Sequence, residues 1–255
     1  MLYNIGDQSI RVGDQDIKVR LWTSKEERAF LWQKNETTSA AEVVKTMILP
    51  NIEYKPMTLD EFKYLMFKLR GLSVSPEVAF SYTCNGEMRV DTETGERVQA
   101  DDERLKDEEF KKKLLIQPCK SRVDSSCSIE DAVEFTPSTL KDGDIIEQDD
   151  IKVTLRKIPT KELLLKVLNE EKEEDQKYYE FLACIKEVNY AGETLSSFTF
   201  EEVREFFDSV PSFIFKKLYR QFYDIKGNIK FSISDSCPLC GSKNRVLFDD
   251  ILEFL

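Results

Sequence analysis

Apolar and polar residues alternate in the same way in two short segments that lie far apart in the chain. The first is residues 17–21, with the sequence IKVRL, and the second is Ile151–Leu155, with the sequence IKVTL. A period of two is typical of a strand that buries one face. We therefore predict a half-buried strand at each place.

Helix starts follow both predicted strands. Ser24 and Glu27 form a capping box for a helix that we expect to reach about residue 34, and Thr160 opens one that reaches about residue 171. In the first half, Ser39 and Glu42 then open a further helix, which Pro50 should end. Its apolar stripe consists of Val43, Val44, Met47 and Ile48.

The closest correspondence between the two halves lies in a pair of capped helices. Thr58 with Glu61, and Thr199 with Glu202, have the spacing of capping boxes, and apolar residues follow at matching positions. We expect these helices to end at Gly71 and at Pro211. The second half then adds a helix over about residues 212–223, rich in aromatic side chains.

A cysteine-containing hairpin is expected at the end of each half. Residues 229–234 and 244–248 should form two strands around Cys-Pro-Leu-Cys-Gly at 237–241. At the corresponding point of the first half, Cys84-Asn85-Gly86 carries the Asn-Gly signature of a tight hairpin without metal.

Strand, capped helix and hairpin thus recur in the same order, which favours an internal duplication over chance similarity of common elements. The predicted fold is α+β, with two divergent copies of a strand–helices–β-hairpin unit, the second ending in a zinc-ribbon-like knuckle. We expect the first copy, with a degenerate knuckle, at residues 1–90 and the second at 146–255. Residues 91–145 should connect them, first as a charged, solvated helix or loop to about residue 113 and then as an irregular polar segment through Gly143.

Charge and composition narrow the function. The net charge of −11 makes nucleic acid an unlikely partner, because binding phosphates requires a surplus of Lys and Arg. Histidine is absent, which excludes Ser/His and Cys/His catalytic pairs, and we expect no enzyme. We expect neither a signal peptide nor a membrane-spanning helix.

Six cysteines in 255 residues do not make a disulfide scaffold, so we expect mostly free thiols. Cys237 and Cys240 are the candidate metal ligands, and zinc is the expected ion, held with further sulfur ligands from this chain or from a partner. Cys119 and Cys127 are too widely spaced for a second knuckle but are able to reach the first in space. A metal-free knuckle remains the alternative.

Two other patterns have simpler explanations. The acidic run at residues 170–175 is typical of a solvated helix face. The aromatic residues between Phe206 and Tyr223 indicate core packing, but they exceed what a small domain needs, so part of this stretch is a candidate interface. The apolar chain end, residues 251–255, is a second candidate.

One segment carries a family resemblance. The sequence FKYLMFKLRGLS at residues 62–73, followed by the cysteine turn at Cys84 and later by Pro159-Thr160-Lys161-Glu162 and the knuckle, resembles the T4-type baseplate hub subunit and hub assembly proteins of contractile-tailed phages. The chain departs from the pattern of that family at Cys84, where the complete knuckle is missing. It implies a phage tail assembly protein that is made in the host cytoplasm, binds other tail or baseplate proteins and is a candidate virion component.

Two alternatives compete with this interpretation. One is a zinc-ribbon module that binds nucleic acid or a transcription complex, against which the acidic charge argues. The other is an enzyme, for which the chain offers no histidine, no Gly-rich phosphate loop and no recognisable pair of acids.

Overall fold

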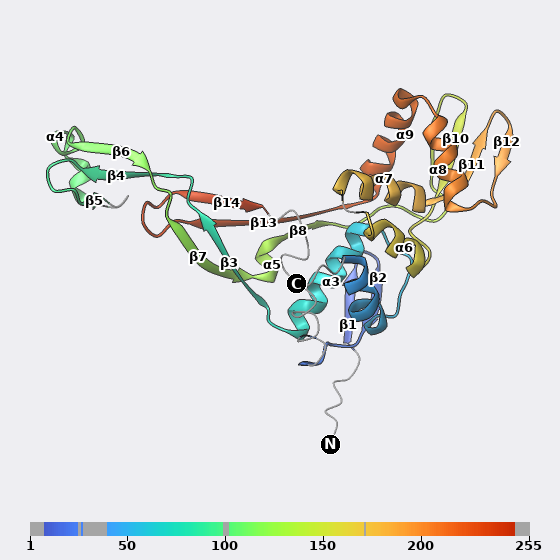
Figure 1. Ribbon diagram of the computed structural model, residues 1–255, viewed down its shortest axis with the longest axis horizontal. Coiled ribbons are helices and arrows are strands. Elements are labelled where there is room, and N and C mark those ends of the chain that lie inside the picture. Colours follow the sequence, from blue (N-terminus) through green and yellow to red (C-terminus); the bar gives the residue numbers. More distant parts are fainter. Residues whose placement is uncertain (1–7, 25–26, 28–39, 99–101, 171, 248–255) are drawn as a thin grey trace, which may run out of the picture. The chain divides into compact units, whose positions relative to one another are not determined.

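The computed structural model describes residues 8–24, 27, 40–98, 102–170 and 172–247 (Figure 1). Helices and strands are mixed, so the α+β prediction is confirmed. The chain forms two compact units that are discontinuous in sequence. Among the described residues, unit 1 contains those up to Ser75 together with Phe135–Ile229, and unit 2 contains Pro76–Glu134 together with Lys230–Leu247.

Unit 1 has two antiparallel sheets. The first is a hairpin of β1 and β2, whose turn contains Gly13 with a positive φ of 57°. The second has the strand order β12-β11-β10-β9. The strands are β1 (Gln8–Val12), β2 (Gln15–Val19), β9 (Ile145–Gln148), β10 (Ile151–Leu155), β11 (Ile185–Tyr190) and β12 (Glu193–Leu195). The predicted strand at Ile151–Leu155 is confirmed, and the one predicted at 17–21 is β2, shifted by two residues.

The helices of unit 1 pack on these strands, α3 against β1 and α9 against β9. They are α2 (Ala40–Val43), η1 (Val44–Ile48), η2 (Leu49–Asn51), α3 (Leu59–Ser73), α6 (Lys161–Leu168), α7 (Glu173–Ala183), α8 (Phe200–Ser209) and α9 (Ser212–Ile225). Phe62 and Phe67 of α3, Phe181 of α7 and Phe222 of α9 are completely buried. The core of unit 1 is therefore built from helix faces with a helical spacing of large apolar residues.

The capping boxes predicted at Thr58 and at Thr199 are present. Thr58 accepts from the backbone N–H of Glu61 while the Glu61 carboxylate accepts from the N–H of Thr58, and Thr199 and Glu202 do the same. The prediction that Gly71 ends the first helix is wrong, because α3 continues to Ser73. The helix before Pro211 ends at Ser209, as the restriction imposed by proline requires.

The earlier helices agree less well with the prediction. The helix predicted from Ser24 to about residue 34 lies mostly outside the described residues. The one predicted from Ser39 is divided into α2, the π-helical η1 and the 3-10 helix η2, so Pro50 lies inside a helical turn rather than after it. Val43, Val44 and Ile48 are nevertheless buried, as their spacing predicted.

Unit 2 is built from a long two-stranded ribbon and a hairpin. The ribbon pairs β3 with β7 and β4 with β6, and β5 adds a third strand beside β4. The elements are β3 (Glu77–Thr83), β4 (Glu87–Asp91), β5 (Arg97–Val98), η3 (Glu103–Lys106), α4 (Glu108–Lys111), β6 (Leu114–Pro118), β7 (Arg122–Ser128), α5 (Ile129–Ala132) and β14 (Lys243–Leu247). The chain passes from one unit to the other after Ser75, within strand β8 (Val133–Thr136) and within strand β13 (Asn228–Ser236).

Two predictions fail in unit 2. Cys84-Asn85-Gly86 does not turn a tight hairpin, since β3 pairs with β7 and β4 with β6. The segment from 114 to 143 is not irregular, because it supplies β6, β7, α5 and β8. By contrast, the hairpin of β13 and β14 is confirmed, with Ser232 opposite Leu247 and Ser236 opposite Lys243.

The proposed duplication stays a prediction. Unit 1 contains the strand and helix portions of both expected copies, and unit 2 contains both cysteine segments. The compact units therefore do not follow the successive segments 1–90, 91–145 and 146–255.

Candidate metal centre

Two cysteines of the ribbon lie opposite each other where its strands are interrupted. Cys84 directly follows β3, and Cys119 directly follows β6. The backbone N–H of Cys84 donates to the Ser121 carbonyl at 2.9 Å, and the N–H of Cys119 donates to the Gly86 carbonyl at 2.8 Å. These bonds continue the ribbon through the interruption and fix the two Cα–Cβ bonds in place.

The other two cysteines belong to the turn between β13 and β14. The N–H of Gly241 donates to the carbonyl of Cys237 at 2.8 Å, and the N–H of Cys237 donates to the carbonyl of Ser242 at 3.0 Å. Gly241 has a φ of +70°, a conformation that glycine adopts without strain. Residues 237–242 thus form a tight loop, which we call the knuckle, that presents both thiols.

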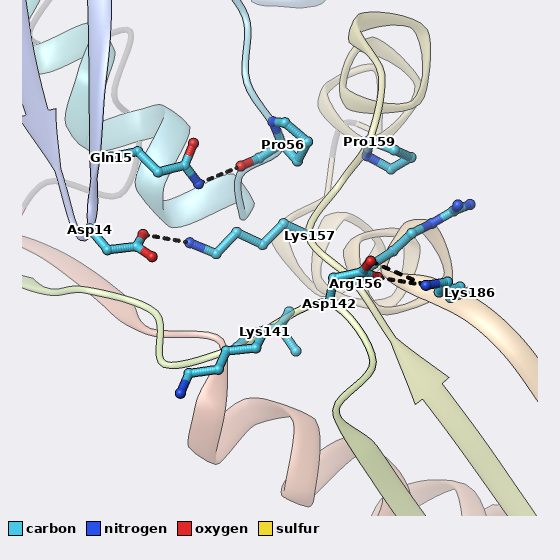
Figure 2. Close-up of a pocket in the computed structure, with 10 residues that line it drawn as sticks. Asp14, Gln15, Pro56, Lys141, Asp142, Arg156, Lys157, Pro159 and Lys186 are labelled. Carbon is cyan, nitrogen blue, oxygen red and sulfur yellow. Dashed lines mark hydrogen bonds and ion pairs between the residues drawn. The ribbon is translucent and has the colours of Figure 1, made fainter.

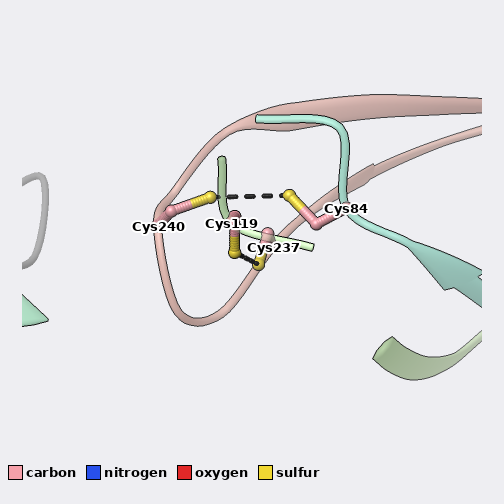
Figure 3. Close-up of side chains that lie close together, drawn as sticks. All are labelled: Cys84, Cys119, Cys237 and Cys240. Carbon is pink, nitrogen blue, oxygen red and sulfur yellow. Dashed lines mark hydrogen bonds between the residues drawn. The ribbon is translucent and has the colours of Figure 1, made fainter. Parts of the chain in front are cut away.

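The four sulfur atoms converge (Figure 3). All four Sγ atoms lie within 4.8 Å of one another; Cys84 and Cys240 are 3.5 Å apart, and Cys119 and Cys237 are 3.8 Å apart. A tetrahedral ion with Zn–S bonds of about 2.3 Å places its sulfur ligands about 3.8 Å from one another. The spacing therefore fits one tetrahedral ion and is too small for a multinuclear cluster.

Neighbouring N–H groups favour thiolates at this site. The backbone N–H of Gly86 donates to the Cys84 sulfur at 3.3 Å, and the Asn244 side-chain amide donates to the same sulfur at 3.4 Å. Asn244 is held in turn by the N–H of Asn85, which donates to its Oδ1 at 2.9 Å. Such groups around the ligands orient them and stabilise their charge.

Two of the thiols differ in acidity. Burial acts to raise the pKa of Cys240, but hydrogen bonds from Ser242 and contacts with Cys84 and Cys237 outweigh it and lower the pKa to about 7. Burial raises the pKa of Cys84 to about 11, although the donors on Gly86 and Asn244 oppose the change. The geometry therefore already favours one thiolate before any ion binds.

Access to the centre is from one side. Cys84, Cys119 and Cys237 are buried, whereas Cys240 is half-buried. Cys240 lines an open pocket of about 280 Å³ together with Ser242 and the β4–β6 face that carries Glu87, Arg89 and Ile116. Among the described residues, Cys240 is therefore the most accessible of the four thiols.

The donor set determines which chemistry the centre supports. Four soft sulfur ligands favour zinc among the common metals, and they occupy all four tetrahedral positions. A centre of this kind leaves no position for a substrate or an activated water. An ion bound by all four sulfurs would hold chain segments together rather than act in catalysis.

Of the residues predicted from the sequence, Cys237 and Cys240 lie at this centre and Cys119 reaches it. Cys127 does not, because it lies in β7 opposite Val78. Cys184 is buried in unit 1. Cys84 was interpreted as part of a turn without metal, and its only sequence signal was its place in the repeated pattern.

A second cavity lies in unit 1 and has a volume of about 510 Å³ (Figure 2). Its charged residues are largely paired with each other: Lys157 contacts Asp14 at 3.6 Å, and Lys186 contacts Asp142 at 3.0 Å. The residues that line it include neither cysteine nor serine. The cysteine centre is the better candidate, because its four donor atoms converge on one point.

Comparison with known proteins identifies the family. A family model described as the T4 bacteriophage base plate protein matches residues 6–255. The chain belongs to this baseplate family. The resemblance seen in the sequence is therefore confirmed, and membership supports a structural, non-enzymatic role in a phage baseplate, as a virion component that associates with other tail or baseplate proteins.

Two further comparisons were negative. No curated protein and no solved structure is similar to this chain. Within the described residues, no helix combines the length and the apolar character needed to cross a membrane.

Proposed function

We propose that this baseplate protein is a subunit or assembly factor of the hub and acts by binding other baseplate proteins, with a structural zinc ion in unit 2. Cys84, Cys119, Cys237 and Cys240 hold the ion. Zinc links the knuckle to the ribbon. Without the ion, the short antiparallel strand pairings of unit 2 would hold these two segments only weakly. Synthesis in the host cytoplasm precedes incorporation into the tail.

The convergence of four sulfur atoms is the observation that supports the zinc site in this proposal. The two ribbon cysteines are separated by 34 intervening residues, and the knuckle lies more than a hundred residues further along the chain. The four cysteines meet only through the tertiary fold. A site closed by four thiolates stabilises that fold. A free nucleic-acid-binding ribbon is the weaker alternative, because the net charge of −11 opposes contact with phosphates.

Exposed apolar side chains suggest where partners bind. In β6, Leu115 is 53% exposed and Ile116 is 59% exposed; because they are consecutive, they lie on opposite faces of the strand. In α9, Phe213 is 59% exposed. Much of the aromatic stretch is instead internal, as Phe207 and Phe222 are buried. The other candidate surface, residues 251–255, lies outside the described residues.

One comparison of three variants tests the proposal. We expect Cys84→Ser to lose the zinc and, with it, association with baseplate proteins, because three sulfurs do not close the site. Cys127→Ser is the matched control and should keep both, since that thiol is outside the centre. Ile116→Asp should keep the zinc but lose association.

Two measurements on each variant give the result: zinc per purified chain by elemental analysis, and co-purification of baseplate proteins from infected cells. Less than about a tenth of an equivalent of zinc in the wild-type chain would contradict the metal proposal. Undiminished association of Ile116→Asp would remove β6 as the contact surface. Hydrolase or transferase activity of the wild-type chain would overturn the structural role.

A further inference from the structure

A lysine and two acids meet in the interior of unit 1. Lys226, the residue after α9, is 3% exposed; Asp60, in the first turn of α3, is 8% exposed; Glu180, in α7, is fully buried. Lys226 Nζ contacts the Asp60 carboxylate and lies 3.1 Å from Glu180 Oε2. Two carboxyl groups therefore share one amine in a largely buried site, where the side chains of Lys226, Asp60 and Glu180 are 3%, 12% and 1% exposed.

Aromatic side chains surround this triad. The rings of Phe181 and Phe222 are 5.3 Å apart, and Tyr219 lies within 6.3 Å of both. Lys226 Nζ is 5.4 Å from the centre of the Tyr223 ring. Such an environment solvates ions poorly, so a buried ion pair is costly relative to a neutral product made from the same groups.

The two acids have different hydrogen-bond environments. The backbone N–H of Leu59 donates to Glu180 Oε1 at 2.8 Å, whereas Oε2 has no well-aligned hydrogen bond. Burial raises the pKa of Glu180, and the charge of Asp60 adds to this, although Lys226 opposes it. Burial acts to lower the pKa of Lys226, but the two carboxyl groups outweigh it and raise the pKa. Lys226 therefore lies between two acids whose surroundings differ.

We propose that Lys226 and Asp60 form an intramolecular amide bond, with Glu180 relaying the protons. A proton moves from Nζ to the Asp60 carboxylate, and the neutral amine attacks Cγ of Asp60. The N–C bond forms and a C–O bond of Asp60 breaks. The departing oxygen takes two hydrogens that Nζ carried, so one water molecule leaves and Glu180 returns to its starting state.

Position and burial make this condensation favourable here although it is unfavourable in water. Groups held in contact react with effective concentrations of about 10⁵ M or more. The product replaces buried charges by a neutral amide, and the water is released to solvent. The bond would join positions 166 residues apart and fasten the start of α3 to the end of α9.

A second buried pair in the same helix turn provides the control. Lys157 Nζ lies 2.8 Å from Glu61, and their side chains are 10% and 2% exposed. The second acid near Lys157 is Asp14, whose side chain is 83% exposed. This pair therefore lacks a buried acid to relay protons, and it should remain an ion pair.

Intact mass spectrometry of the purified full-length chain tests the proposal. The wild-type mass should be lower than the sequence mass by one water molecule, and trypsin should fail to cleave after Lys226, giving a branched peptide that contains Asp60. Lys226→Arg and Glu180→Gln should restore the full mass, while Lys157→Arg should keep the loss.

Each other outcome overturns the proposal. A folded wild-type chain that keeps its full mass after prolonged incubation contains no such bond, and this result does not depend on whether any variant folds. A lost water that fragmentation places elsewhere, such as a succinimide at Asp142-Gly143, excludes the cross-link. A bond that still forms in folded Glu180→Gln removes Glu180 from the mechanism.

Discussion

Gly86 illustrates how a residue without a side chain controls the cysteine centre. A Cβ atom at this position would lie 2.2 Å from both Cβ and Oγ of Ser242 and 3.3 Å from the sulfur of Cys240. Its φ is not in the left-handed region, so space rather than backbone strain is what restricts the position. The ribbon and the knuckle can approach each other only because Gly86 presents no side chain.

We therefore predict that Gly86→Ala separates the knuckle from the ribbon and weakens zinc binding by about tenfold or more. Competition with a chromophoric chelator measures the change. Ser242→Gly is the control, and combining it with Gly86→Ala should recover most of the affinity, because it removes the clashing atoms. Wild-type affinity of Gly86→Ala alone would show that the two segments do not meet as described.

At this scale, the sequence predicted half of the centre. Cys237 and Cys240 were recognisable because proline and glycine at fixed positions shape a local loop. For the other two ligands the sequence is weaker: it places Cys84 in a turn without metal and offers Cys119 and Cys127 equally, because the meaning of a single cysteine depends on a partner strand far along the chain. The sequence does not predict the role of Asn244 for a similar reason. Its hydrogen-bond partners Asn85 and Cys84 are far away in the sequence and lie beside it only in the folded chain.

Among the elements, the two capped helices have the same local chemistry in different surroundings. Thr58 is fully buried, and Glu61 both caps α3 and accepts from Lys157 at 2.8 Å. Thr199 is exposed, and the box that it forms with Glu202 lies at the surface. Sequence spacing alone predicts that the two capping boxes contribute equally to stability. Because Thr58 is buried and Thr199 is exposed, their contributions differ.

We expect Thr58→Ala to lower the free energy of unfolding by about 2 kcal/mol and Thr199→Ala by about 0.5–1 kcal/mol. The larger cost arises because a buried N–H group loses its acceptor with no water to replace it. Urea denaturation of the two variants measures both values. Equal losses would mean that the N–H groups at the start of α3 find another acceptor.

Local sequence patterns therefore predict helices more reliably than they predict strand pairing. Capped helices are specified by residues three or four positions apart, and the sequence predicts α3 and α8 in this way. The partner of β3 is β7, with Phe80 opposite Ser125, and no short-range signal distinguishes this pairing from a hairpin with β4. The Asn-Gly dipeptide favoured the hairpin, but pairing with distant strands overrode that preference.

For the molecule as a whole, the two compact units cut across the order of the sequence. Unit 1 contains two stretches of chain with most of the helices, and unit 2 contains two further stretches and the cysteine centre. The hydrophobic cores of the two units also differ. Unit 1 buries many large apolar side chains, whereas the buried cluster around the centre of unit 2 consists of three cysteines and Val123, with Tyr82, Met88 and Cys240 packed against it. Small cores of this kind depend on a metal or another cross-link.

Removal of zinc should therefore affect the two units unequally. We predict that an excess of chelator abolishes hydrogen-exchange protection in β4, β6, β13 and β14, because ion binding supplies much of the folding free energy there. Amides of α3 and β10 should stay protected, since their neighbours are buried aromatic and aliphatic side chains. Exchange measured by mass spectrometry, before and after chelation, gives the comparison, and adding zinc back should restore the lost protection. Loss of protection in α3 together with β13 would mean that the units fold as one. Unchanged protection in β13 and β14 would mean that packing alone holds the knuckle on the ribbon.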